Sequence, residues 1–179
     1  MIYMFLANGF EEVEALCPLD LIRRAGLDIK TVGVGGTHIT GSHGITVVAD
    51  MVVEDFCDAN PTGVILPGGM PGTTNLDACA AVHRALDDAN KNGALVAAIC
   101  AAPSVLGKRG DLAGKEAICY PGFESYLEGA KISDSSVACD GRYITAAGMG
   151  VALEFGLAIV VYFCGEDKAE ALRRAVIAK

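Results

Sequence analysis

The sequence is poor in positive charge and in aromatic side chains, and it contains no tryptophan. Its 179 residues include 14 Lys and Arg against 22 Asp and Glu, a formal net charge of −8. This balance removes the basic surface that nucleic-acid binding needs, so we expect no nucleic-acid partner. Hydrophobic residues make up 52% of the chain, which excludes a disordered protein and predicts one domain over residues 1–179.

The sequence also lacks a convincing membrane segment. Residues 146–165 are long and apolar enough to span a bilayer, but Glu154 lies near their middle. A buried charge at that depth is costly, so a core helix is the better prediction. The apolar start Met1–Leu6 has no basic residue before it and is followed by Glu11 and Glu12, which favours a buried strand over a signal peptide.

Paired cysteines are missing as well. No two of the seven cysteines form a CxxC pair or another metal-ligand spacing, so we expect no zinc site and no metal cofactor. An odd number of scattered cysteines favours a reducing compartment, and we expect a cytoplasmic protein. The cysteines are Cys17, Cys57, Cys79, Cys100, Cys119, Cys139 and Cys164.

What the sequence does contain is an alternation of short apolar runs with segments of helical period. This rhythm predicts an α/β fold, a mostly parallel sheet with helices on both faces. A β-hairpin insertion is expected at residues 37–49, with its turn at Gly41–Gly44. The expected strands are 2–7, 28–34, 63–66 and 94–99, with two shorter ones meeting at Asp140-Gly141; the expected helices are 11–25, about 75–92, 102–108, 149–164 and 166–177.

The strongest candidate for chemistry is Cys100, which stands between the apolar run 94–99 and a helix. Ligands of open α/β sheets bind beyond the carboxyl ends of the strands. Ala97, Ala98, Ala101 and Ala102 are the small neighbours that a sharp strand-to-helix turn requires. The helix amino terminus is expected to lower the thiol pKa and favour the thiolate. The alternative is a small apolar cysteine buried at the end of a core strand.

Two further loops follow predicted strands. In the loop 67–72, Gly68 and Gly69 allow close backbone approach and offer N–H groups to an oxyanion, although paired glycines also serve ordinary turns. The loop lacks the spacing of a nucleotide-binding motif. After the first strand, Glu14 shares a helical face with apolar residues, so it is a candidate buried proton carrier. Otherwise it serves the helix dipole, as acidic residues in a first turn commonly do.

The three histidines do not complete a Cys-His pair. His38 and His43 flank the predicted hairpin turn, and His83 lies on a predicted helix surface. None of them follows a core strand on the side expected for Cys100, so a peptidase or amidase mechanism that depends on an imidazole is the least favoured function.

Several segments, in this order, resemble the ThiJ/PfpI superfamily, in particular the branch of the parkinsonism-associated protein deglycase and its bacterial homologues. They are residues 9–14 (GFEEVE), 23–26 (RRAG), 64–69 (VILPGG), 97–103 (AAICAAP) and 154–159 (EFGLAI). The resemblance covers essentially the whole chain. It implies a flavodoxin-like doubly wound domain that forms a homodimer. Members are described as glyoxalases that need no glutathione or metal, as deglycases, as chaperones and as oxidative-stress sensors.

The resemblance also implies roles for individual residues. Cys100 is the reactive thiol, Glu14 hydrogen-bonds its sulfur, and Gly69 and Ala101 are the backbone donors around that sulfur. This chain departs from the family at two positions: Tyr120 stands where many members have histidine, and His43 where arginine is frequent. The second change makes anion binding at the hairpin sensitive to pH.

Two functions follow as hypotheses. The first is a cofactor-independent glyoxalase or deglycase that acts on small 2-oxoaldehydes or on glycated protein, with Cys100 as nucleophile, Glu14 as proton shuttle and Gly69 and Ala101 as oxyanion donors. Gly68, His43 and Tyr120 are expected in the substrate-binding shell. The second is a redox-responsive stress protein without turnover, in which Cys100 is oxidised to the sulfinate.

Overall fold

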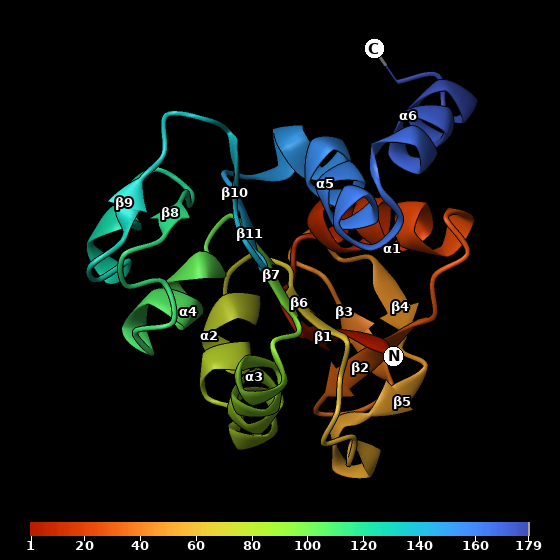
Figure 1. Ribbon diagram of the computed structural model, residues 1–179. Coiled ribbons are helices and arrows are strands. Elements are labelled where there is room, and N and C mark those ends of the chain that lie inside the picture. Colours follow the sequence, from red (N-terminus) through yellow and green to blue (C-terminus); the bar gives the residue numbers. More distant parts are fainter. Residues whose placement is uncertain (179) are drawn as a thin grey trace.

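A computed structural model describes residues 1–178 and places seven of its strands in one sheet, in the order β10-β11-β7-β6-β1-β2-β5 (Figure 1). Neighbouring strands are parallel except for the antiparallel pair β10–β11. The strands are β1 (Ile2–Ala7), β2 (Ile29–Val34), β5 (Met51–Val52), β6 (Gly63–Leu66), β7 (Leu95–Ile99), β10 (Val137–Asp140) and β11 (Tyr143–Ala146). The flavodoxin-like α/β fold predicted from the sequence is thus confirmed.

Helices cover both faces of the sheet (Figure 1). The alternation of side chains along β1 shows this directly: Met4 and Leu6 pack in one apolar cluster with α1 and α5, whereas Tyr3 and Phe5 pack in another with α3 and α4. The helices are α1 (Glu12–Arg24), α2 (Gly72–Asp77), α3 (Ala80–Asn92), α4 (Pro103–Lys108), α5 (Ala152–Cys164) and α6 (Glu166–Ala175), with short 3-10 turns η1 (Val53–Asp55), η2 (Glu124–Tyr126) and η3 (Met149–Val151).

Two small sheets stand apart from the main one. The expected hairpin insertion is present as antiparallel β3 (His38–Thr40) and β4 (Thr46–Val48). A second pair, β8 (Glu116–Ala117) and β9 (Lys131–Ile132), is parallel and was not predicted. Strands of two residues are too short to show an alternation of apolar and polar side chains, so periodicity could not reveal them.

The helix expected over about 75–92 is wrong in one respect, because it is broken at Ala78-Cys79. Cys79 is extended, with φ −89° and ψ 111°, and separates α2 from α3. Leu76 and Val82 are both fully buried in the same cluster. In a continuous helix these positions would point about 120° apart, so the break lets both reach one core. The last apolar helix likewise begins at Ala152, after η3, rather than at Met149.

No helix within residues 1–178 has the length and hydropathy that a membrane crossing requires. This agrees with the interpretation of residues 146–165 as part of the core: their helical portion, α5, packs along α1 and against the sheet.

Candidate active site around Cys100 and Glu14

Cys100 follows β7 directly and holds an unusual backbone conformation. Its φ is 65°, in the left-handed region that non-glycine residues rarely occupy. Two hydrogen bonds fix it there: its N–H donates to the Ala146 carbonyl at 2.8 Å, and its carbonyl accepts from the Tyr120 N–H at 2.8 Å. The sharp turn predicted from the small neighbours of Cys100 is therefore present, and it lifts the half-buried side chain beyond the carboxyl end of the sheet.

Glu14 points inward from the first turns of α1. It is 1% exposed, so it is not one of the solvated acidic side chains that commonly stabilise the amino terminus of a helix. Its Oε2 accepts the Gly68 N–H at 3.1 Å, and its carboxyl group also accepts the Met149 N–H and hydrogen-bonds Cys100. The interpretation of Glu14 as a buried carboxyl group is confirmed. Glu11 does the capping instead, since its Oε2 accepts the Glu14 N–H at 2.7 Å.

The two side chains perturb each other's ionisation. Burial raises the pKa of Glu14 to about 7, and the hydrogen bonds that it accepts offset only part of that rise. Burial also raises the pKa of the Cys100 thiol to about 12, and the neighbouring Glu14 carboxylate adds to the rise. The expectation that the helix amino terminus favours the thiolate is therefore wrong: burial and Glu14 outweigh the backbone donors that face the sulfur.

The glycine pair packs tightly against both side chains. A Cβ at Gly68 would lie 2.5 Å from Glu14 Oε2 and 2.6 Å from Cys100 Cβ, so only glycine fits there. Gly69 has φ +90° and presents its N–H to the Cys100 sulfur, as Ala101 does. Gly68 was predicted as an oxyanion or substrate donor, but its N–H is already donated to Glu14. It positions the carboxyl group.

Tyr120 and a residue that the sequence did not reveal, Gly148, form one wall of the site. A Cβ at Gly148 would lie 3.4 Å from the Tyr120 ring and 3.9 Å from Glu14 Oε1. Tyr120 is 51% exposed and lines a shallow depression. The only sequence signal for Gly148 is its place just after β11, at the carboxyl edge of the sheet where ligands bind.

His43 does not join this group within one chain. Its Nδ1 lies 3.0 Å from Glu12 Oε2 and its N–H donates to Glu12 Oε1 at 2.7 Å, while its ring extends into solvent. No hydrogen bond among the described residues connects His43 to Cys100 or Glu14. Because Glu12 is buried, desolvation alone would raise its pKa, but the bonds from His43 and Ile45 lower it to about 2. Glu12 therefore anchors the hairpin as a carboxylate.

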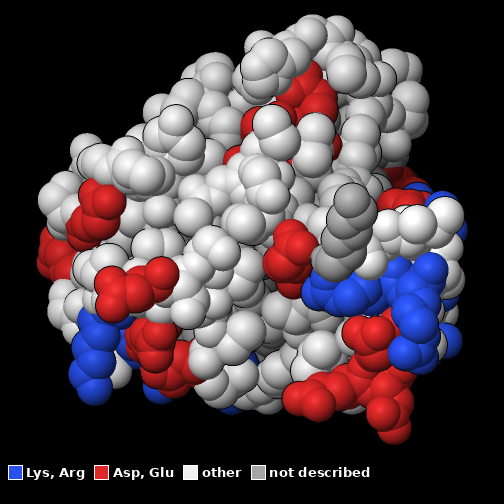
Figure 2. Space-filling model, turned by 90° about the horizontal axis from the view of Figure 1, so that it is seen from above, with Lys and Arg blue, Asp and Glu red and all other residues white. Residues whose placement is uncertain are grey.

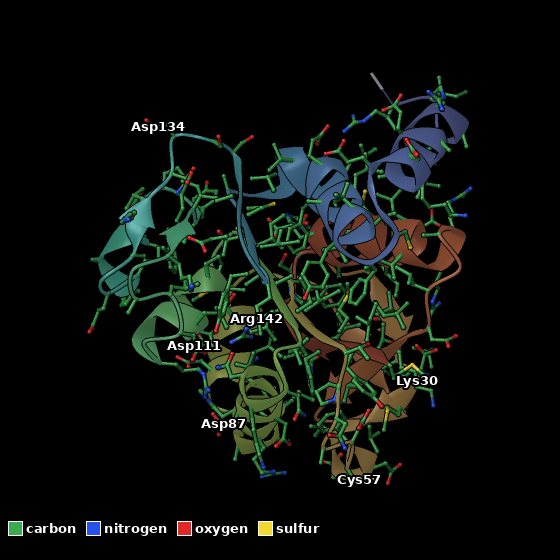
Figure 3. The ribbon with its side chains drawn as sticks, in the orientation of Figure 1. Lys30, Cys57, Asp87, Asp111, Asp134 and Arg142 are labelled. Carbon is green, nitrogen blue, oxygen red and sulfur yellow. The ribbon has the colours of Figure 1, made fainter. Side chains whose placement is uncertain are left out.

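Two other polar clusters are structural. Ligand atoms of Glu11, Glu12 and His43 lie within 4.8 Å of one another, but the carboxylates of Glu11 and Glu12 already accept backbone N–H groups. The second cluster surrounds α3, where Asp87, Asp111 and Arg142 gather (Figure 3). Arg109 donates to Asp87 and to Asp111, and Asn90 bonds to both Asp111 and Arg142, which ties α3 to the following segments.

The fold and this site define a class of protein: a doubly wound α/β protein with a cysteine at a strained strand-to-helix turn and a buried glutamate beside its sulfur. The chain belongs to the DJ-1/PfpI family, whose family model matches residues 1–161. The resemblance found in the sequence is confirmed.

Named relatives and solved structures agree with this assignment. The chain is 34% identical to the Parkinson disease protein 7 homolog of Danio rerio, with 98% of this chain and 96% of the relative aligned. It is 32% identical to the glutathione-independent glyoxalase DJR-1.2 of Caenorhabditis elegans, over 90% of this chain and 87% of the relative. The crystal structure of Drosophila melanogaster DJ-1beta superposes with a TM-score of 0.93 at 31% identity, over 99% and 97% of the two chains.

Other relatives are longer than this chain. It matches the Arabidopsis thaliana DJ-1 homologs B and A at 36% and 35% identity, with 92% of this chain aligned in each case, but it spans only 38% and 43% of their lengths. The oxidized DJ-1 of Toxoplasma gondii has the same fold, with a TM-score of 0.95 at 27% identity over 99% and 97% of the chains.

Proposed function

We propose that this protein is a cofactor-independent glyoxalase or deglycase, which converts 2-oxoaldehydes, free or as adducts on protein, into 2-hydroxy acids. The observation that carries the proposal is the contact between the buried Glu14 carboxyl group and the Cys100 thiol, with the Ala101 and Gly69 N–H groups facing the same sulfur. A nucleophile, a proton carrier and two oxyanion donors thus converge on one point. The name of the Caenorhabditis elegans relative adds support.

In the first step the Cys100 sulfur attacks the aldehyde carbon. Because its pKa is raised to about 12, the thiol needs a base at neutral pH, and the Glu14 carboxylate is in hydrogen-bond contact to accept the proton. The new C–S bond leaves negative charge on the former aldehyde oxygen. The N–H groups of Gly69 and Ala101 stabilise that charge, and Glu14 passes the thiol proton to the oxygen, which completes a hemithioacetal and restores the carboxylate.

In the second step Glu14 removes the proton from the hemithioacetal carbon and returns it to the adjacent ketone carbon, while the hydroxyl proton moves to the former ketone oxygen. The product is a thioester of a 2-hydroxy acid. Water then cleaves the C–S bond, which releases the acid and restores the thiol. One carbon is oxidised while its neighbour is reduced, so the sequence needs no external oxidant or reductant. A group with a pKa of about 7 suits these opposite transfers, since it gives and takes a proton near neutral pH.

The test is the conversion of methylglyoxal to lactate by purified protein freed of metal. We expect turnover by the wild type and none by Cys100→Ser or Glu14→Gln. Cys79→Ser is the matched control, because Cys79 is also half-buried but lies at the break between α2 and α3. Turnover that survives in Cys100→Ser, or a wild type without turnover, would reject the proposed enzyme.

The alternative function is a redox-responsive stress protein, and the oxidized relative from Toxoplasma gondii favours its consideration. Two equivalents of peroxide would carry the Cys100 thiolate to the sulfenate and then to the sulfinate, releasing one water at each step. A thiol whose pKa is raised is slow to supply that thiolate. Selective oxidation of Cys100 among the seven cysteines at mild peroxide, without any aldehyde turnover, would favour the sensor.

A peptidase or amidase has less support. All three histidines lie in the described part of the chain, and none is hydrogen-bonded to Cys100: His38 contacts Thr37, His43 contacts Glu12, and His83 contacts Asp77 and Arg109. Tyr120 occupies the position where many relatives are expected to have histidine.

The proposal includes a homodimer in the cytoplasm. All seven cysteines are free, in keeping with a reducing compartment. Val13 and Ile45 are 43% and 55% exposed and both lie beside the Glu12 anchor, since Glu12 Oε1 accepts the Ile45 N–H. Figure 2 shows that uncharged residues, apolar and polar together, cover much of one face of the molecule, with most charged side chains toward its lower edges. Exposed apolar side chains such as Val13 and Ile45 are what a second copy would cover.

A further inference from the structure

A shallow depression of about 340 Å³ lies beside the catalytic pair. This volume is within the range of small-molecule sites. None of its lining side chains carries a charge. They are those of Tyr120, Pro121, Ala147, Gly148, Met149, Gly150 and Val151.

The depression is continuous with the reacting groups. Met149 lines it and also donates its backbone N–H to the Glu14 carboxyl group. Gly148 lies between the Tyr120 ring and Glu14 Oε1. Tyr120 is tied to the turn of the nucleophile, because its N–H donates to the Cys100 carbonyl. A molecule bound covalently at Cys100 can therefore extend one arm over Gly148 into the depression.

The surface of the depression favours an apolar occupant. Tyr120 and Met149 are 51% and 52% exposed, so their apolar atoms lose contact with water when a ligand covers them. An anionic group there would lose part of its hydration, and no lining residue carries a positive charge to offset that loss. Electrostatics therefore disfavours acidic substituents, whereas burial favours alkyl and aryl groups.

We propose that this depression is the subsite for the substituent on the ketone carbon, and that it selects 2-oxoaldehydes with uncharged alkyl or aryl substituents larger than methyl. The inference rests on the proposed function and names its substrate class. Each added methylene that enters the depression should raise kcat/KM about fourfold. The preference should end when the depression is filled.

The experiment compares kcat/KM for methylglyoxal, its ethyl and propyl homologues, phenylglyoxal and a phenylglyoxal with a ring carboxylate. We expect a rise along the alkyl series and a carboxylate-bearing substrate that reacts at least tenfold more slowly than phenylglyoxal. Equal kcat/KM along the series would overturn the subsite.

Two variants connect the preference to the residues. Tyr120→Ala should lower kcat/KM for phenylglyoxal more than for methylglyoxal, mainly through KM. Tyr126→Ala is the control, because Tyr126 is 44% exposed but lies on η2, outside the lining of the depression. It should leave the ratio between the two substrates unchanged. An unchanged ratio in Tyr120→Ala would also overturn the subsite.

A measurement that does not depend on turnover, the rate at which Cys100 is alkylated, separates this inference from the proposed function. Cys100 is alkylated with iodoacetamide and with its N-propyl and N-benzyl derivatives, and the adduct is measured by mass spectrometry. Faster reaction of the larger reagents relative to a free thiol, lost in Tyr120→Ala, supports the subsite even if no aldehyde is converted. Turnover combined with no size preference in either series retains the enzyme and rejects the subsite.

Discussion

At the residue scale, the site is governed by one carboxyl group, that of Glu14, which is held away from water. Glu14 gains little from solvation, so its neutral form is favoured up to about pH 7 rather than its ordinary 4.5. In the window between these two values the folded protein binds more protons than the unfolded chain. Stability contributed by this group is therefore present at low pH and is lost as pH rises from about 4.5 to about 7.

The direction of this pH dependence gives a prediction for Glu14→Gln. The glutamine amide cannot ionise, so the variant should not lose folding stability in this way as the pH rises. Relative to the wild type, it should gain up to about 3 kcal/mol in unfolding free energy between pH 4.5 and pH 7.5. Urea denaturation at both pH values measures the difference. Asp28→Asn, which replaces an exposed carboxylate, is the control variant. A constant difference between Glu14→Gln and the wild type would contradict the raised pKa.

The same variant should make Cys100 more reactive while abolishing turnover. Burial raises the thiol pKa most, but the Glu14 charge adds to it, and only the charge is removed in Glu14→Gln. We expect alkylation of Cys100 by iodoacetamide at pH 8.5 to become at least about tenfold faster. Slower alkylation would show the opposite, that a proton on Glu14 stabilises the thiolate in the wild type.

Local sequence was sufficient to select Cys100 and Glu14 as candidates, because a nucleophile after an apolar strand and a glutamate on an apolar helix face are visible in a short window. It was not sufficient to predict their pKa values. These depend on burial and on each other's charge, and the two residues meet only after β1, α1 and β7 have packed. Gly148 was missed for the same reason.

At the scale of elements, the position of Glu14 depends on how closely α1 approaches α5. Gly156 on α5 faces Pro18 and Leu21 on α1. A Cβ at Gly156 would lie 2.9 Å from Pro18 Cα and 2.7 Å from Leu21 Cδ1, so a methyl group would push the helices apart. The backbone contact matters most, since a leucine side chain can move but the Pro18 backbone cannot do so alone.

Gly156→Ala should therefore destabilise the protein by about 1–3 kcal/mol, despite the better helix propensity of alanine. Thermal or urea denaturation measures this. Gly150→Ala is the matched control for stability, because a Cβ at Gly150 meets nothing within 4 Å and its φ lies outside the left-handed region. If Gly156→Ala is more stable than the wild type, α1 and α5 can accommodate a methyl group at this position and the predicted steric clash is wrong.

The elements also show where periodicity succeeds. β1 and β6 match the predicted strands residue for residue, because buried parallel strands are apolar throughout and end abruptly at turn residues. Periodicity does not reveal the break at Ala78-Cys79, because the segments on both sides of it have helical spacing. The chain changes direction there so that Leu76 and Val82 can pack in the same core cluster.

At the scale of the whole molecule, the surface beside Glu12 leads to a prediction about assembly. A homodimer that buries Val13 and Ile45 should have a sedimentation mass of twice the 18.5 kDa of one chain. Ile45→Arg should reduce that mass to the value of the monomer. Ile132→Arg is the control, because Ile132 is 47% exposed but lies on β9, far from the hairpin (Figure 1). Analytical ultracentrifugation measures both. A wild-type monomer, or a dimer unaffected by Ile45→Arg, would contradict this interface.

The sequence by itself determined the class of fold, the acidic character of the chain and the placing of Cys100 at the end of a core strand. Each of these follows from composition or from patterns a few residues long. Only the tertiary structure decided that Glu14 lies against the Cys100 sulfur, that Gly68 is engaged with Glu14, that His43 is held by Glu12, and that an apolar depression opens beside them. These features join residues far apart in the chain, so they exist only once sheet order and helix packing bring the carboxyl ends of the strands together.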